Sequence, residues 1–151
     1  MKQSIVYLLF AIIISSSVVY GLQFTDCGSK TGSFNKIVVS DCDTTKNECI
    51  LKRNTTASIT INFALNEEAT KISTVVHGKI MGVEMPFHLQ NPDACVDSGL
   101  KCPLEKGETY EYKAILPVLK AYPKVNVLVK WELKDQNNED IICVEIPAKI
   151  Q

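Results

Sequence analysis

TASITINFALN (residues 56–66) is the stretch that decides the fold class. Its apolar side chains alternate with mostly polar ones and are Ala57, Ile59, Ile61, Phe63 and Leu65. Because successive side chains of a β-strand point to opposite faces, this period of two predicts a strand with one buried face and one solvated face. Such a strand needs a second apolar layer to cover it.

Other stretches supply that layer. Strand character is present in residues 34–40, 71–80, 108–118, 125–133 and 141–150. Polar turn segments separate them, and KDQNNED (134–140) between two of them indicates a hairpin. Many short strands at close spacing, without a helical stretch, predict an all-β, two-layer antiparallel sandwich.

The N-terminus has the pattern of a secretory signal. Lys2 precedes an apolar run, and compact residues, Val19 and Gly21, follow it. We interpret residues 1–21 as a cleaved signal peptide. A membrane anchor is the alternative, but the run is shorter than the ~20 residues that a span needs. We therefore expect one secreted domain, residues 22–151.

Charge excludes one class of partner. The formal net charge of the chain is −1, and loss of the leader with Lys2 makes the mature chain slightly more acidic. A protein of this balance gives no reason to expect nucleic acid as a partner.

The six cysteines all follow the predicted leader, which indicates disulfides formed in an oxidising compartment. Cys42 and Cys49 enclose one short polar loop, and Cys95 and Cys102 enclose another, while Cys27 and Cys143 lie near the ends of the mature chain. Six cysteines allow fifteen connectivities, so spacing alone does not choose one. A zinc site is disfavoured because no pair has the Cys-x-x-Cys spacing.

The parts of a hydrolase are missing from the sequence. The chain has two histidines, His77 and His88, and no Gly-x-Ser-x-Gly motif. Glu67 and Glu68 are adjacent in a turn, where a solvated acidic pair is the simpler explanation. We therefore expect neither an enzyme nor a cofactor. Asn54 begins the sequon Asn-Thr-Thr in a polar turn, which predicts N-glycosylation.

VVHGKIMGVEMPF (75–87) is unusually apolar for a segment with two glycines and a proline. Glycine and proline break regular structure, so part of this run is expected to be a loop, and loops are normally polar. Core packing explains Val76 simply. Core packing is a weaker explanation for the apolar residues beside Gly82 and Pro86. The methionines there favour a surface that accepts varied apolar shapes, such as the mouth of a lipid site.

The sequence resembles the lipid-recognition, or ML domain, family over nearly the whole mature chain. The stretches that carry the resemblance include VVHGKIMGVEMPF (75–87) and NPDACVDSGLKCPLEKGETYEYKAILPV (91–118). The resemblance implies an immunoglobulin-like β-sandwich with an apolar lipid pocket between its sheets. It also implies three disulfides, Cys27–Cys143, Cys42–Cys49 and Cys95–Cys102.

Within that family, a Phe, a Val and a Tyr line the entrance to the lipid site, and they correspond here to Phe87, Val118 and Tyr122. The predicted lipid contacts are Phe87, Val118, Tyr122, Phe63, Val76, Met85, Leu116, Tyr112 and Trp131. The resemblance also predicts membrane or partner contact by the apolar loop, and these residues are Lys79, Ile80, Met81, Gly82 and Val83.

The function implied is that of a secreted, monomeric carrier of a sterol or fatty acid, in extracellular fluid or in an endosomal or lysosomal lumen. Two alternatives stay open: an extracellular carrier of hydrophobic semiochemicals and a lipid sensor that acts with a receptor. Lys79 would favour fatty acids if it attracted a carboxylate, whereas a solvated lysine is the simpler explanation.

Overall fold

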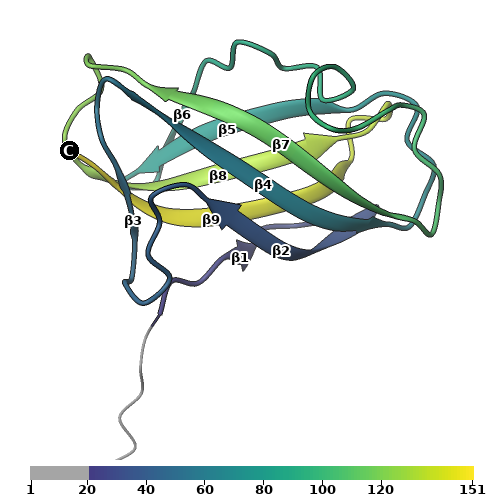
Figure 1. The fold of residues 1–151 in the computed structure, drawn as a ribbon, viewed down its shortest axis with the longest axis horizontal. Helices are drawn as coiled ribbons and strands as arrows, with labels where there is room; N and C mark the ends of the chain where they lie inside the picture. Colours follow the sequence, from purple (N-terminus) through teal and green to yellow (C-terminus); the bar gives the residue numbers. More distant parts are fainter. Residues whose placement is uncertain (1–20) are drawn as a thin grey trace, which may run out of the picture.

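Two β-sheets packed face to face make up the computed structural model, which describes residues 21–151 (Figure 1). The larger sheet has the order β1-β9-β8-β5-β6, and the smaller has the order β2-β4-β7. The larger sheet contains β1 (Thr25–Asp26), β5 (Ser73–Ile80), β6 (Val83–Pro86), β8 (Asn126–Lys134) and β9 (Asp140–Ile150). The smaller contains β2 (Gly32–Val39), β4 (Thr55–Leu65) and β7 (Thr109–Val118).

The predicted two-sheet sandwich is confirmed, with one addition. A short strand, β3 (Cys49–Leu51), pairs with β9 in parallel, whereas the other pairings are antiparallel. Within residues 21–151 no helix is long and apolar enough to cross a membrane. The predicted signal peptide lies outside the described residues except for Gly21.

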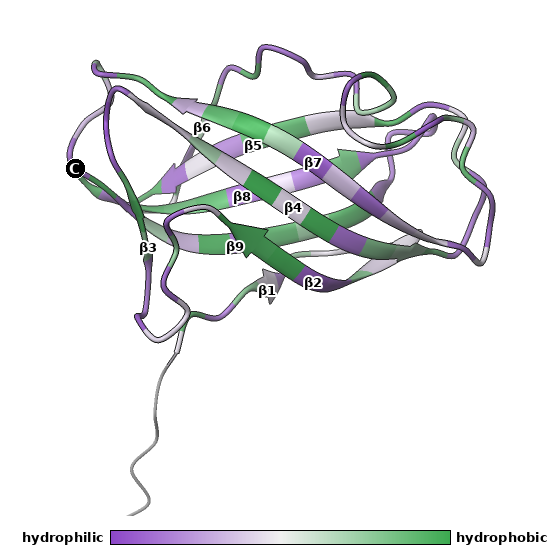
Figure 2. Ribbon diagram, viewed as in Figure 1, coloured by the Kyte–Doolittle hydropathy of each residue, from purple (hydrophilic) through white to green (hydrophobic). Residues whose placement is uncertain are grey.

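β4 is the central strand of the smaller sheet and follows the alternation in its sequence. Its odd-numbered side chains from Ala57 to Leu65 are buried, and its even-numbered ones are more exposed. They share the inner face with partners on β7, because Ile61 pairs with Tyr112 and Phe63 with Tyr110. Figure 2 shows the resulting stripes of apolar and polar residues along β4.

β8 and β9 form the centre of the larger sheet and supply the other half of the core. Their inner faces meet in register, with Val129 opposite Ile146 and Trp131 opposite Val144, and all four side chains are buried. The predicted hairpin at 134–140 is confirmed. It is held by the carboxylate of Asp135, which accepts hydrogen bonds from two backbone N–H groups of the turn.

The three disulfides have the pairing that the family resemblance implies: Cys27–Cys143, Cys42–Cys49 and Cys95–Cys102. The first ties the N-terminal segment to β9, and the other two each close a short loop. None of them connects β6 to β7, which are the edge strands on one side of the sandwich. No disulfide therefore closes that side.

The expected apolar loop within residues 75–87 is limited to the turn of a β-hairpin. β5 and β6 pair from His77–Pro86 to Ile80–Val83, which leaves only Met81 and Gly82 in the turn. Both have positive φ, 50° and 82°, as a two-residue type I′ turn requires. The right-handed twist of the two strands favours this turn, and pairing across it satisfies the backbone that a loop would leave to water.

Candidate functional site

A small apolar cavity lies between the two sheets, with a volume of about 30 Å³. β4 and β7 form one wall and β8 and β9 the other, while β3 and the end of β2 close one end. Its lining residues are Val39, Cys49, Leu51, Ala57, Ser58, Ile59, Leu116, Val129, Trp131, Ile146 and Ala148. The lining carries no charged side chain, so the cavity suits an apolar occupant.

Two of the nine predicted lipid contacts, Leu116 and Trp131, line this cavity. Phe63, Val76 and Tyr112 are almost completely buried, but they pack elsewhere in the core. Sequence reasoning missed most of the lining because these residues are ordinary inward positions of strands. Small side chains at inward positions, Ala57 and Ala148, were the one available signal, since they leave space that larger neighbours do not fill.

A groove of about 230 Å³ adjoins the cavity and shares two of its walls, Leu51 and Ala57. Val118, a predicted entrance residue, lies on this groove with only 2% of its surface exposed. The structure thus places Val118 beside the cavity rather than inside it.

The other two predicted entrance residues lie together at the β6–β7 side. The rings of Phe87 and Tyr122 pack edge to face with centroids 5.2 Å apart, and both are partly buried against the core. Gly78 makes room for this pair, because a Cβ atom there would lie 2.5 Å from the Phe87 ring. Burial raises the pKa of the Tyr122 phenol above its ordinary value.

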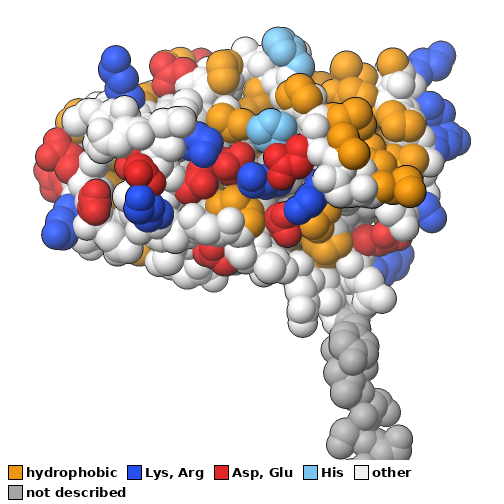
Figure 3. Space-filling view, turned by 180° about the vertical axis from the view of Figure 1, so that it is seen from behind, with side chains coloured by type: hydrophobic (Ala, Val, Ile, Leu, Met, Phe, Trp, Pro, Cys, Tyr) orange, Lys and Arg blue, Asp and Glu red, His pale blue; other side chains and the backbone are white. Residues whose placement is uncertain are grey.

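The β5–β6 hairpin carries the most exposed apolar side chains of this region. Met81 is 99% exposed, Val83 63% and Met85 46%. Val83 pairs with Ile80 and Met85 with Gly78, so these positions share the inward-facing side of the hairpin. Figure 3 shows apolar side chains gathered toward one end of the molecule, on the face opposite to that of Figure 1.

The two charges of the hairpin lie on its other side. Lys79 Nζ is 3.4 Å from Glu145 Oε1, and Glu84 Oε1 is 3.6 Å from Lys130 Nζ. Lys79 therefore has a carboxylate partner on the outer face of the larger sheet, away from the cavity. This position does not support the idea that Lys79 receives the carboxylate of a fatty acid.

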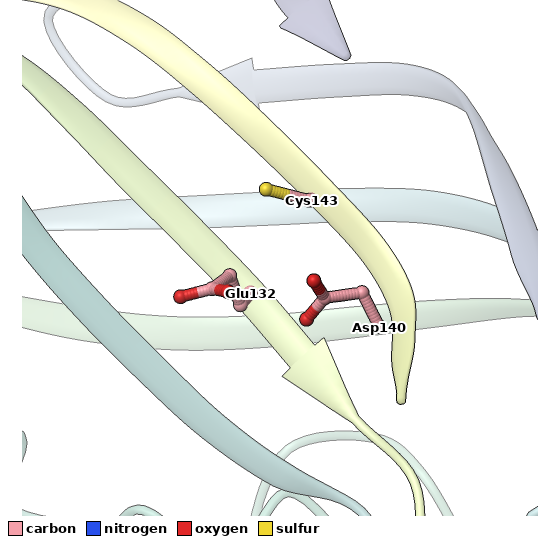
Figure 4. Close-up of side chains that lie close together, drawn as sticks. All are labelled: Glu132, Asp140 and Cys143. Carbon is pink, nitrogen blue, oxygen red and sulfur yellow. The ribbon is translucent and has the colours of Figure 1, made fainter. Parts of the chain in front are cut away.

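Glu132, Asp140 and Cys143 come close together on the outer face of β8 and β9 (Figure 4). They do not fit a metal site. Cys143 is bonded to Cys27, and the ammonium of Lys134 lies 3.1 Å from Glu132 Oε1 and 2.8 Å from Asp140 Oδ1. Burial raises the pKa of Asp140. Burial acts to lower the pKa of Lys134, but its hydrogen bonds to Asp140 and Glu132 outweigh this effect and raise the pKa. Lys134, together with Lys130 at 3.7 Å from Glu132 Oε1, thus supplies the positive charge at these carboxylates.

Asn54 lies in the turn between β3 and β4, and its side chain is exposed. Its φ of 64° is tolerated by Asn better than by most residues. Thr56, the third residue of the sequon, is exposed as well. The geometry is accessible to a glycan, and glycosylation stays a prediction.

Three comparisons with known proteins bear on this arrangement. The sequence pattern described as the ML domain matches residues 21–150. NPC intracellular cholesterol transporter 2 homolog a of Drosophila melanogaster is 67% identical over 145 residues, covering 94% of this chain and 98% of the relative. NPC intracellular cholesterol transporter 2 of Bos taurus is 37% identical over 143 residues, covering 95% and 94%.

Among solved structures, the chain is similar to a Niemann-Pick type C2 protein from the Japanese carpenter ant. The TM-score is 0.81 at 35% identity, with 85% of this chain and 99% of that chain covered. The resemblance that the cysteines and motifs indicated is thereby confirmed.

Proposed function

Because the chain belongs to the ML domain family, we propose that it is a lipid carrier, which holds a sterol or fatty acid between its sheets and carries it through an aqueous compartment. The apolar cavity between the sheets supports this proposal most directly. Relatives named as cholesterol transporters favour a sterol. Carriage of this kind needs neither a catalytic group nor a cofactor.

The cavity must widen to accept such a cargo. Pockets for small molecules typically enclose about 300–1,000 Å³, whereas this cavity measures about 30 Å³. We place the widening at the β6–β7 side, where no disulfide joins the two edge strands. Phe87 and Tyr122 lie there and would move apart as the cargo enters.

The energetics of burial support binding in such a slot. Each methylene that leaves water contributes about 0.8 kcal/mol, so a cargo with ten or more buried carbons offsets the several kcal/mol lost to immobilisation. Sheet separation adds a further cost, because it breaks packing contacts between the apolar faces.

Transfer requires contact with another apolar phase, and we assign this role to the exposed tip of the β5–β6 hairpin, around Met81 and Val83. Apolar side chains of this kind insert into the surface of a bilayer or dock on a membrane protein. The predicted signal peptide and the three disulfides favour a secreted or lumenal protein.

The experiment is a titration with a fluorescent sterol and a fluorescent fatty acid, followed by stopped-flow transfer to vesicles. Ala57→Val adds bulk to the cavity wall, and Ile115→Thr changes an exposed side chain on the outer face of the smaller sheet. We expect Ala57→Val to weaken binding about tenfold and Ile115→Thr to leave it unchanged. If the folded wild type bound neither probe, the carrier function would be refuted.

A further inference from the structure

The turn between β3 and β4, residues 52–54, is tied to both sheets. The Arg53 N–H donates to Gln151 O at 2.9 Å, directly after β9 of the larger sheet. The Asn54 N–H donates at 2.7 Å to the carbonyl of Val118, the last residue of β7 in the smaller sheet. Figure 1 shows this turn and the loop between β7 and β8 at the end of the sandwich that carries the C-terminus. The turn is therefore a fixed base next to that loop.

The β7–β8 loop, residues 119–124, has one backbone hydrogen bond within it, from the Tyr122 N–H to Leu119 O at 3.1 Å. Arg53 supplies two more, because its Nη1 atom lies 3.1 Å from Lys120 O and 3.3 Å from Tyr122 O. That nitrogen carries two hydrogens, so each carbonyl can accept its own. Hydrogen bonds from a charged donor are stronger than those between neutral groups. We call these two hydrogen bonds the Arg53 clamp.

Charge pairing does not explain the position of this arginine. Among residues 21–151, no carboxylate forms an ion pair with Arg53. The turn and the loop contain no acidic residue, and they carry three further cations, Lys52, Lys120 and Lys124. The two loop carbonyls are therefore the partners that account for where the guanidinium lies.

Tyr122 links the clamp to the predicted entrance. Its carbonyl accepts one of the two hydrogen bonds from Arg53, and its ring packs edge to face on that of Phe87, with centroids 5.2 Å apart. Phe87 follows β6 of the larger sheet and Tyr122 follows β7 of the smaller sheet, so this contact bridges the sheets at the β6–β7 side. A loop that moved outward would take the Tyr122 ring with it.

We propose that Arg53 is a positioning residue for the entrance and sets the rate at which cargo passes. The clamp keeps the Tyr122 ring against Phe87, so the β6–β7 side stays closed until the loop moves away. Because the same movement precedes entry and exit, the clamp slows both and leaves the affinity nearly unchanged. This inference rests on the proposed carrier function.

Stopped-flow kinetics with a fluorescent sterol test the proposal. We expect Arg53→Ala to raise the association and dissociation rate constants about tenfold each, the factor that loss of about one hydrogen bond gives, with little change in the dissociation constant. Lys120→Ala is the matched control, because it removes one positive charge from the same loop but keeps the carbonyl that Arg53 binds. Its rate constants should equal those of the wild type.

A double variant separates positioning from a merely structural role. If Arg53 acts through the Tyr122 ring, Arg53→Ala will not accelerate exchange further in a Tyr122→Ala background. Arg53→Lys keeps the charge and an N–H donor, so it should exchange cargo more slowly than Arg53→Ala. The same comparison with Tyr122→Ala can be made with Arg53→Lys if the alanine variant fails to fold.

A measurement without cargo keeps this inference distinct from the carrier function. Nuclear Overhauser contacts between the rings of Tyr122 and Phe87 should be present in the wild type and weakened in Arg53→Ala. Unchanged ring contacts, unchanged rate constants, or equal acceleration in the Tyr122→Ala background would each overturn the positioning role while the wild type still binds sterol. If the wild type binds neither the sterol nor the fatty acid, the carrier function is refuted and the role of Arg53 falls with it.

Discussion

At the residue scale, Gly78 and Phe87 depend on each other. Gly78 pairs with Val129 on β8 and faces inward, and the Phe87 ring occupies the space where a side chain would stand. Only the absence of a Cβ allows the ring to reach Tyr122 at this distance. The glycine in VVHG therefore sets the position of a predicted entrance residue.

We predict that Gly78→Ala displaces Phe87, lowers stability by about 1–3 kcal/mol, as overpacking does, and weakens sterol binding. Chemical unfolding and a fluorescent-sterol titration measure the two effects. The control is Gly78→Ala combined with Phe87→Ala. If the ring is the clashing group, the two changes will be less than additive, and full additivity would show that the clash lies elsewhere.

The buried phenol of Tyr112 gives a second prediction at this scale. Burial raises its pKa from 10.0 to about 12, although hydrogen bonding to Thr74 acts in the opposite direction. Since the folded state favours the protonated phenol, this stabilisation is present below pH 10 and is lost as the pH rises toward 12. Two pH units correspond to roughly 2–3 kcal/mol.

We therefore expect the free energy of unfolding of the wild type to fall more steeply between pH 10 and 12 than that of Tyr112→Phe. Urea unfolding at a series of pH values measures the difference, in which the titration of lysines cancels. Parallel curves for the two proteins would contradict the burial-induced shift.

At the scale of elements, the β5–β6 hairpin combines a demanding turn with an unsuitable residue. Type I′ turns favour Asn-Gly because both central residues have positive φ, yet Met81 occupies the first position with its side chain 99% exposed. The turn geometry and the solvent exposure of this position would both favour a small polar residue. A residue that breaks such local rules is expected at a functional site.

Met81→Asn is predicted to keep or raise the melting temperature, to leave equilibrium lipid binding unchanged and to slow transfer to vesicles severalfold. Asn suits the turn but removes the apolar contact. Calorimetry, titration and stopped-flow transfer give the three readouts. Ile115→Thr, which removes another exposed apolar side chain, 63% exposed on the smaller sheet, serves as the control. Unchanged transfer by Met81→Asn would remove the hairpin tip from the mechanism.

At the scale of the whole molecule, the disulfides leave one side of the sandwich free. The Cys27–Cys143 bridge closes 116 residues of chain, whereas the other two close 7 residues each. None of the three joins β6 to β7. The proposed opening at the β6–β7 side therefore breaks no disulfide.

We predict that replacing Cys27 and Cys143 by alanine lowers the free energy of unfolding by about 5 kcal/mol and that replacing Cys95 and Cys102 lowers it by about 2.5 kcal/mol, because a longer loop restricts the unfolded chain more. Guanidinium unfolding of the two double variants measures both. The reverse order would mean that native contacts, rather than loop entropy, dominate.

The sequence by itself determined the six longer strands, β2, β4, β5, β7, β8 and β9, and their faces. The period of two in residues 56–66 fixes which side chains of β4 are buried, because that alternation is a local property of an extended backbone. Turn residues similarly predicted the hairpin at 134–140, and the motifs and cysteine order indicated the family and its disulfides.

Only the tertiary structure decided which inward side chains border a cavity. Trp131 and Tyr112 are equally buried and both inward, but only Trp131 lies on the cavity wall. Contacts between strands likewise decided that Lys79 pairs with Glu145. They also decided that β5 and β6 pair as a hairpin. Strand faces follow from neighbours in sequence, whereas cavities and ion pairs depend on how residues distant in the chain fit together in space.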